Sequence, residues 1–247
     1  MLGLSTGLMY ERYTSTTMDL KQATAGTAAG LRLWLKHNTG VDPDGAKWDD
    51  SSGRNNHAVQ SDDLKKGTPS GGGLELNGTS DFYNLTDRID ISDAGGFCLA
   101  VVLTLDDTSN TNLSGNTIMS DSANELIKID SNKRIRINTN DPSNVTTDLD
   151  FVGTPFQAVK TLILLNRIEG VTAEYLTFKN GTVLTIDTDT TSNEENSNGF
   201  QLDTIFSNGG TSEFLNATVF ELAFWDRALT NQEIVDVNYY LKNIHGL

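Results

Sequence analysis

The sequence predicts an all-β protein, a two-sheet antiparallel jelly-roll β-sandwich that ends in one C-terminal α-helix. Short apolar runs recur along most of the chain and are separated by turn-forming Gly and Asn, which is the spacing of a sandwich or barrel. Strands and helices do not alternate as they would in a parallel sheet. A chain of 247 residues is long enough to bury one sizeable core.

Residues 1–30 differ in composition from the rest, because they are rich in Thr, Gly and Ala and cannot form a core alone. We predict an N-terminal anchoring arm and linker over 1–30, followed by the jelly-roll domain over 31–247. The alternative is that the arm contributes a first strand of the sandwich. The apolar residues of the arm that we expect to contact a partner are Leu2, Leu4, Leu8, Met9, Tyr10 and Tyr13.

The β pattern begins at residue 31, where Leu31, Leu33 and Leu35 alternate with Arg32, Trp34 and Lys36. Further strands are expected at 74–76, 82–85 and 97–105, since each is apolar and is bounded by glycine-rich turns. The single cysteine, Cys98, lies in the last of these runs. It excludes an intramolecular disulfide, and we expect a buried, inert thiol.

Two hairpins are predicted in the middle of the chain. In the first, over 126–137, the apolar residues flank Ser131-Asn132, and we expect Lys128, Arg134 and Arg136 to form its solvated face. The alternative for these basic residues is a patch for an anionic ligand. The second hairpin turns at Asn180-Gly181, the strongest short hairpin signal in the chain. Other strands are expected at 161–165, 200–206 and 217–225.

The last segment predicts a helix over 231–245. Thr230 is a suitable N-cap, and Glu233 three positions later completes a capping box. Gly246 follows the last turn as a C-cap. The apolar residues that share one helical face and should be buried against a sheet are Ile234, Val237, Leu241 and Ile244.

Two parts of the chain together resemble the concanavalin A-like jelly roll in its laminin G-like or pentraxin-like form, as found in structural proteins of tailed-phage virions. The first is Trp48 to Ala58, with an Asp-x-Ser-Gly-x-x-Asn loop, followed by the strand pair over 73–83. The second is Glu221 to Leu241, with an aromatic-Asp-Arg-Ala-Leu turn before the helix. The resemblance implies the fold more than the function, because the family includes carbohydrate-binding modules, adhesion domains and virion proteins.

The sequence predicts no enzyme. Glucanases that share this scaffold carry a Glu-x-Asp-x-(x)-Glu run on one strand, and this chain has no such run. Glu221 is followed on the same face by Ala223 and Trp225. The histidines, His37, His57 and His245, are scattered, and Gly-x-Ser-x-Gly and His-Glu-x-x-His motifs are absent from the sequence.

Glycan binding needs exposed aromatic rings beside polar groups, and Trp48 lies in a polar loop where we expect an exposed ring. His57 and Tyr83 are the other candidate glycan-binding residues. The same loop carries candidate calcium ligands, Asp42, Asp44, Asp49 and Asp50, because calcium takes six to eight oxygen ligands. The alternative is a solvated acidic loop. Calcium is the one cofactor that the sequence suggests.

The chain has 33 acidic and 18 basic residues, and its net charge of −15 opposes binding to nucleic acid and anionic membranes. We see no signal peptide and no segment long enough to insert into a membrane. A fold used mostly outside cells, in a chain without an export signal or disulfide, leads us to expect a virion structural or decoration protein of a tailed phage, in the head, neck or tail fibre. Such a protein is made in the host cytoplasm and is released by lysis.

In that setting the arm would bind other virion proteins, the chain would form a homo-oligomer, and the jelly roll would contact cell-surface polysaccharide of the host. The alternative is a free, extracellular carbohydrate-binding or adhesion module.

Overall fold

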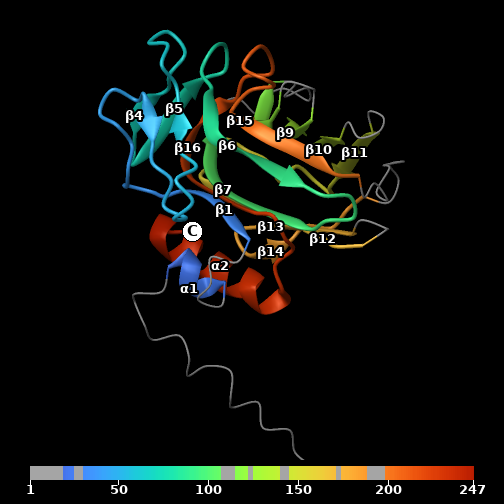
Figure 1. Cartoon of the computed structure of the whole chain (residues 1–247). Coiled ribbons are helices and arrows are strands. Elements are labelled where there is room, and N and C mark those ends of the chain that lie inside the picture. Colours follow the sequence, from blue (N-terminus) through green and yellow to red (C-terminus); the bar gives the residue numbers. More distant parts are fainter. Residues whose placement is uncertain are drawn as a thin grey trace, which may run out of the picture.

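The computed structural model describes residues 19–24, 30–106, 115–121, 125–139, 145–170, 174–187 and 198–247. Two antiparallel sheets, each of eight strands in the described part of the chain, pack face to face (Figure 1). This confirms the predicted all-β sandwich with a C-terminal helix. The arm residues Leu2, Leu4, Leu8, Met9, Tyr10 and Tyr13 lie outside the described residues.

One sheet carries both helices on its outer face, and we call it the helix-covered sheet (Figure 1). Strand β1 (Leu31–Leu35) pairs with the second half of β16, and β5 pairs with the first half of β16. The remaining strands lie in the order β14 (Thr182–Val183), β13 (Glu174–Lys179), β12 (Thr161–Ile168), β7 (Phe97–Leu105), β16 (Asn216–Trp225), β5 (Gly73–Asn77) and β4 (Thr68–Ser70).

The opposite sheet completes the sandwich. Its strands lie in the order β11 (Val145–Asp150), β10 (Arg134–Thr139), β9 (Leu126–Ser131), β8 (Asn116–Ser120), β15 (Phe200–Ile205), β6 (Tyr83–Ile91), β3 (Ala58–Val59) and β2 (Lys47–Trp48). The short strands β2, β3 and β4 lie in segments without a strand pattern in the sequence. They form because neighbouring strands offer unpaired backbone groups.

The main core fills the space between the sheets. Phe97 and Phe224 of the helix-covered sheet stack at 5.7 Å between ring centroids, and Phe97 meets Phe200 of the opposite sheet edge-on at 5.4 Å. Aromatic pairs in these geometries add to the stability that burial provides.

A second core lies between the helix-covered sheet and its helices, α1 (Leu20–Ala23) and α2 (Asn231–His245). Trp34 and Trp225 are buried in it. Leu20 and Ala23 are 0% and 2% exposed. Cys98 is also buried there, which confirms the expected burial, and the burial raises the pKa of its thiol well above the usual value.

Helix α2 has the predicted bounds and both predicted caps. The Glu233 N–H donates to the Thr230 hydroxyl at 3.3 Å, and Glu233 Oε2 accepts from the Thr230 N–H at 2.8 Å. Gly246 is left-handed, with φ 67°. The predicted burial of Ile244 is wrong, because this side chain is 50% exposed and His245 instead faces the sheet in the last turn.

The predicted solvated face of the β9–β10 hairpin is also wrong, because Lys128 is only 4% exposed. Each basic side chain of the hairpin lies against a carboxylate: Lys128 against Glu213 at 2.7 Å, Arg134 against Asp150 at 2.7 Å, and Arg136 against Asp148 at 2.6 Å. Strand β11 supplies two of these carboxylates, so the charges are paired across the sheet.

In the part of the chain that the structure describes, neither helix has the length and apolar character needed to cross a membrane.

Candidate functional site

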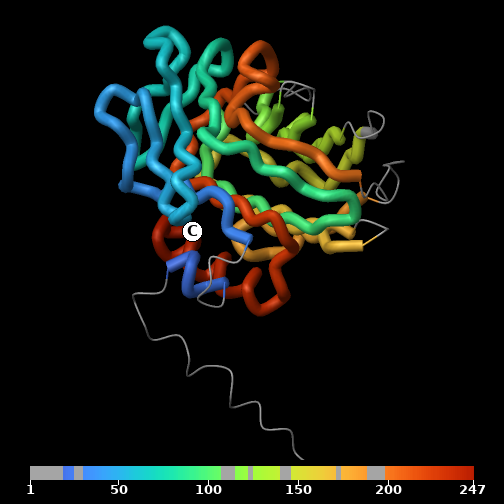
Figure 2. Tube along the Cα trace, viewed as in Figure 1, coloured from blue at the N-terminus to red at the C-terminus, as the bar shows by residue number. Residues whose placement is uncertain are grey.

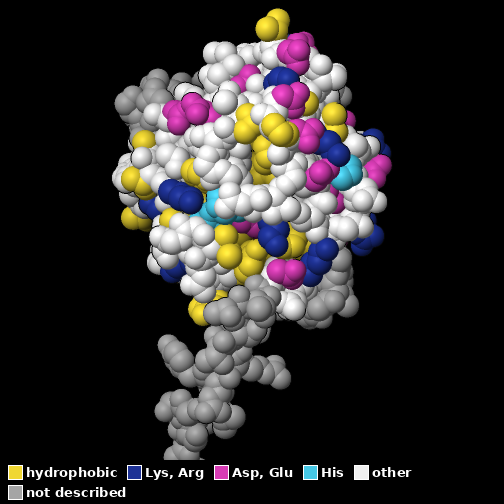
Figure 3. All heavy atoms as spheres, turned by 90° about the vertical axis from the view of Figure 1, so that its left-hand side faces the viewer, with side chains coloured by type: hydrophobic (Ala, Val, Ile, Leu, Met, Phe, Trp, Pro, Cys, Tyr) yellow, Lys and Arg dark blue, Asp and Glu magenta, His cyan; other side chains and the backbone are white. Residues whose placement is uncertain are grey.

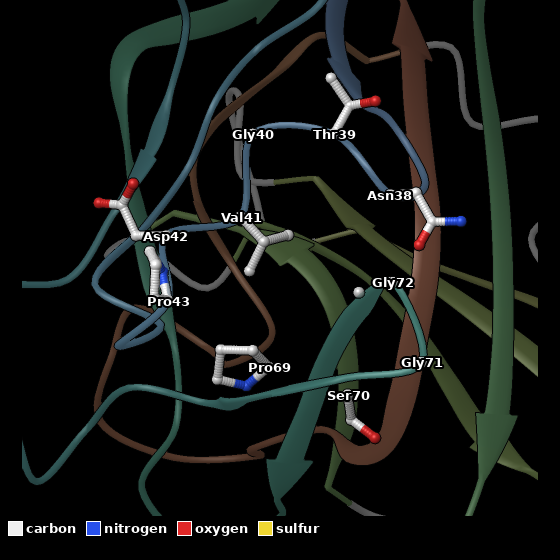
Figure 4. Close-up of a pocket in the computed structure, with 11 residues that line it drawn as sticks. Asn38, Thr39, Gly40, Val41, Asp42, Pro43, Pro69, Ser70, Gly71 and Gly72 are labelled. Atoms are coloured by element: carbon white, nitrogen blue, oxygen red, sulfur yellow. The ribbon is translucent and has the colours of Figure 1, made fainter.

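The segments between β1 and β6 gather at one end of the sandwich, shown in blue to cyan in Figure 2. There a pocket of about 320 Å³ opens between residues 38–43 and the turn from β4 to β5 (Figure 4). We call it the rim pocket. Its lining residues are Asn38, Thr39, Gly40, Val41, Asp42, Pro43, Pro69, Ser70, Gly71, Gly72 and Gly73.

The rim pocket combines a small apolar centre with polar edges. Val41 and Pro69 face each other across the middle of the view in Figure 4, while Asn38 and Asp42 stand at opposite sides. The volume lies at the small end of the range of about 300–1,000 Å³ that ligand pockets span. Short polar side chains and exposed backbone around an apolar patch suit a ligand that carries many hydroxyl groups.

Backbone geometry fixes the shape of this pocket. The Asn38 N–H donates to the Gly72 carbonyl at 2.8 Å, and the Asp49 N–H donates to the Gly40 carbonyl at 2.8 Å. Gly40 has φ +74°, and a Cβ added there would lie 2.6 Å from the Asp49 Cβ. The loop therefore needs glycine at this position, and its conformation exists before any ligand binds.

Trp48 supports this pocket from beneath, and the predicted exposure of its ring is wrong. The side chain is 0% exposed, because Trp48 belongs to β2 and packs into the main core. Its indole N–H donates to the Thr39 carbonyl at 3.1 Å and to the Lys36 carbonyl at 3.3 Å. A buried ring cannot stack on a sugar, so Trp48 positions the loop and does not contact a ligand.

Tyr83, the second aromatic candidate for glycan binding, is likewise buried, at 0% exposure. Its hydroxyl donates to the Gly45 carbonyl at 2.6 Å and accepts from the Gly67 N–H at 2.9 Å. Burial raises the pKa of this phenol, so the proton stays on the oxygen. Tyr83 thus holds the loop before β2 against the segment that leads into β4.

His57, the third glycan-binding candidate, lies on the far side of the same loop. Its Nδ1 is 2.9 Å from Asp49 Oδ1 and 3.2 Å from the Asp50 backbone nitrogen. The protonated Nδ1 donates to the Asp49 carboxylate, and the unprotonated Nδ1 accepts from the Asp50 N–H. Trp48, His57 and Tyr83 therefore do not form one exposed surface.

The four candidate calcium ligands do not converge. Asp44 pairs with Lys66 at 3.2 Å, and Asp49 pairs with Lys47 at 2.6 Å. A hydrogen bond from the Ala46 N–H lowers the pKa of Asp44. Asp42 lines the rim pocket. Among the described residues, no three His, Cys, Asp or Glu side chains are grouped so that they could hold a metal ion, so the structure does not bring Asp42, Asp44, Asp49 and Asp50 together as a cluster of calcium ligands.

Asp50 organises the loop that carries the Asp-x-Ser-Gly-x-x-Asn sequence. Its carboxylate accepts from the backbone N–H groups of Trp34 at 2.9 Å, Ser52 at 2.8 Å and Asn56 at 3.1 Å, and from the Ser52 hydroxyl at 2.7 Å. Gly53 and Asn55 have φ +93° and +59°. The loop is therefore a fixed turn, docked on β1.

One polar cluster is not apparent from the sequence. Glu221 Oε2 lies 2.8 Å from His245 Nε2, and Glu221 Oε1 accepts from the Trp34 indole N–H at 2.6 Å. The His37 ring lies 4.7 Å from the His245 ring, and burial, followed by the electrostatic interaction with His245, lowers the pKa of His37. A β-bulge in β16 next to Phe220 turns Glu221 toward the helices that cover this sheet. No short sequence motif predicts this bulge.

Figure 3 shows the loop end as a surface on which acidic and basic side chains are interspersed. No single-sign area dominates this face, although the chain has a net charge of −15. A surface of this kind does not favour nucleic acid, which requires a concentrated basic area.

No model of a known protein family matches the chain, and no curated protein sequence matches it. Solved structures with a similar fold include Trypanosoma rangeli sialidase, with 16% identity and a TM-score of 0.54 over 87% of this chain and 33% of that chain. The ligand binding domain of botulinum neurotoxin serotype D in complex with N-acetylneuraminic acid has 14% identity and a TM-score of 0.57 over 88% of this chain and 52% of that chain.

A second structure of the serotype D binding domain has 13% identity and a TM-score of 0.56 over 89% of this chain and 53% of that chain. The chain thus spans about a third of the sialidase and about half of the toxin domain. At these identities the likeness establishes a shared β-sandwich fold.

Proposed function

We propose that this chain is a non-catalytic glycan-binding β-sandwich module and that the rim pocket is its glycan site. The observation that carries the proposal is the rim pocket itself, which presents short polar side chains and backbone groups around Val41 and Pro69. Glycine conformations and the buried Trp48 hold this arrangement in place. A ligand that binds a preformed site has a smaller entropic cost to overcome.

The structural comparisons support this proposal at the level of the fold. One similar solved structure is a toxin ligand binding domain in complex with N-acetylneuraminic acid, and others are sialidases. The β-sandwich is thus a scaffold on which glycan contacts occur. The choice of ligand for this chain rests on its own pocket, because a fold does not determine a function.

The non-catalytic part of the proposal rests on the positions of the carboxylates and histidines. Glu221 and His245 form a carboxylate–imidazole pair whose side chains are 1% and 0% exposed, so a substrate cannot reach it. A second such pair among the described residues, Asp49 and His57, is partly exposed, but Asp49 also pairs with Lys47 at 2.6 Å. Asp50 is occupied by backbone donors, which leaves it with a structural role. We therefore expect no turnover of polysaccharides.

The setting that we propose is the particle of a tailed phage, in which this chain is a structural or decoration protein and residues 1–30 anchor it. The support is the resemblance to laminin G-like jelly rolls of virion proteins. A free carbohydrate-binding or adhesion module is the second candidate, and the likeness to the toxin binding domain favours it. Mass spectrometry of purified particles decides between them, since the virion proposal requires this chain to be present in the particles.

The glycan proposal is tested with the full chain on an array of immobilised bacterial polysaccharides and defined oligosaccharides. The expected result is saturable binding to at least one glycan, without change in the glycan on prolonged incubation. Absence of binding to every glycan contradicts the proposal. Release of reducing ends shows instead that the module is an enzyme.

A further inference from the structure

A second pocket, of about 350 Å³, lies between the edges of the two sheets, and we call it the arginine pocket. Three arginines from separate parts of the chain line it: Arg32 on β1, Arg54 on the Asp50 loop, and Arg88 on β6. Asn56 lines it as well, at 3% exposure. The topology thus brings guanidinium groups from both sheets and a loop to one place.

The charge balance at this pocket differs from that of the whole chain. A Cβ placed on Gly53 would lie 3.7 Å from Lys21 Nζ, so a lysine of α1 approaches the same loop. The lining itself has three arginines and two aspartates, Asp87 and Asp90, and Asp226 pairs with Arg32. The whole chain has 18 basic and 33 acidic residues, so the lining is less acidic than the chain as a whole.

The arginines differ in how far their hydrogen-bond donors are occupied. Arg32 is bound by Asp226, and Arg88 Nε donates to Asp90 at 2.9 Å. The side chain of Arg54 is exposed, and among the described residues it has no hydrogen-bond or ion-pair partner. A guanidinium has five N–H donors in a planar fork, so Arg54 and the terminal groups of Arg88 remain able to bind an anion.

The loop that carries Arg54 is rigid. Asp50 holds the turn, as described above, and the Arg54 N–H donates to the Ser52 hydroxyl at 3.1 Å. Asn56 Oδ1 accepts from the Asp87 N–H at 2.8 Å, which ties the loop to β6. The backbone that carries Arg54 is therefore fixed relative to that of Arg88 before any ligand arrives.

We propose that the arginine pocket binds the anionic group, a carboxylate or a sulfate ester, of an acidic polysaccharide. The inference rests on the proposed glycan-binding function and adds a ligand class to it. A planar carboxylate matches the guanidinium fork, and a sulfate ester presents comparable oxygens. The net negative charge of the chain repels a polyanion at long range, so binding depends on close contact with these donors.

The test measures binding of the full chain to three polymers by biolayer interferometry: alginate, which carries carboxylates, dextran sulfate, which carries sulfate esters, and neutral dextran. The variant is R54A/R88A, since both side chains are exposed and their loss leaves the Arg32–Asp226 pair intact. The matched control is K133A/K179A, which removes the same charge outside the pocket. Unchanged unfolding midpoints establish that both variants fold.

The expected result is binding to alginate or dextran sulfate that weakens at least about tenfold in R54A/R88A, a loss of about 1.4 kcal/mol, and less than twofold in the control. Whichever polymer binds identifies the anionic group. Equal affinities of R54A/R88A and the control overturn the inference, as does wild-type binding to neutral glycans alone, which leaves the proposed function intact. Failure to bind every glycan contradicts both.

Discussion

Glu221 Oε2 and His245 Nε2 lie 2.8 Å apart in the interior, where their side chains are 1% and 0% exposed. The contact joins the last turn of α2 to the middle of β16. The same carboxylate accepts from the Trp34 indole N–H, so β1 is fastened at the same point. One buried side chain thus connects three elements that lie far apart in the sequence.

Replacing Glu221 with leucine should destabilise the protein. Leucine leaves both the Trp34 indole N–H and the His245 imidazole without a hydrogen-bond partner, and each unsatisfied buried group costs about 1–3 kcal/mol. Urea denaturation gives the free energy of unfolding. The matched control is Glu75→Leu on the exposed side of β5. Equal losses in the two variants contradict a structural role for the Glu221–His245 contact.

The stability of the fold should also decrease as the pH is lowered, because His37 becomes protonated. Burial, then His245 and Lys160, lower its pKa below the ordinary histidine value of about 6.5, although Glu221 opposes the shift. The unfolded chain then binds the proton more tightly than the folded chain, so neutral His37 stabilises the fold above about pH 6.5. This stability is lost as the pH falls through the lower, folded-state pKa.

The measurement compares thermal unfolding of the wild type and His37→Gln between pH 7 and pH 5. The variant should lose less stability over this range than the wild type does. His57→Gln serves as the control, because it removes another histidine and leaves the His37–His245 contact in place. Parallel pH curves for the wild type and His37→Gln contradict the prediction.

The sequence predicted local features well, because each depends on residues close together in the chain. Thr230, Glu233 and Gly246 set the helix bounds, and Asn180-Gly181 set a hairpin turn. The errors concern contacts between distant segments. Trp48 lies in a polar stretch of the sequence, but it belongs to β2 and is buried in the main core. Arg134 and Arg136 are paired with carboxylates of β11.

The candidate sites were harder to predict than the fold. Four aspartates within nine residues suggested calcium, but the directions of their side chains depend on partners elsewhere, such as Lys66 for Asp44. The rim pocket was not predicted because the backbone of glycines and prolines forms much of it. A concave surface of this kind cannot be recognised from amino-acid composition. The three arginines Arg32, Arg54 and Arg88 are likewise distant in the sequence, so predicting that they line one pocket requires knowledge of the topology.

Tyr83→Phe tests the support beneath the rim pocket. The variant leaves the Gly45 carbonyl and the Gly67 N–H without their partner, which costs about 1–3 kcal/mol for an unsatisfied buried group. We expect a lower free energy of unfolding and weaker glycan binding. Tyr239→Phe is the control, because that ring is 46% exposed. A Tyr83→Phe protein as stable as this control contradicts the role of the hydroxyl.

Two truncations test where the folded domain begins. Removal of residues 1–18 should leave the unfolding midpoint unchanged, because α1 remains on α2. Removal of residues 1–25 also deletes Leu20 and Ala23, which are 0% and 2% exposed, and should cost about 2–5 kcal/mol. Circular dichroism melting measures both. Equal midpoints for the two truncations indicate that the domain begins at residue 31, as predicted from the sequence.

The glycan site is tested most directly by filling the rim pocket and titrating the protein with a glycan that the array identifies. Ser70 lines the pocket, and Ser70→Tyr adds a bulky ring to this lining. Thr68→Tyr is the matched control, because Thr68 is exposed on the same strand and does not line the pocket. By isothermal titration calorimetry we expect Ser70→Tyr to abolish binding and Thr68→Tyr to preserve the wild-type affinity. Unchanged affinity in a folded Ser70→Tyr protein contradicts the rim pocket as the glycan site.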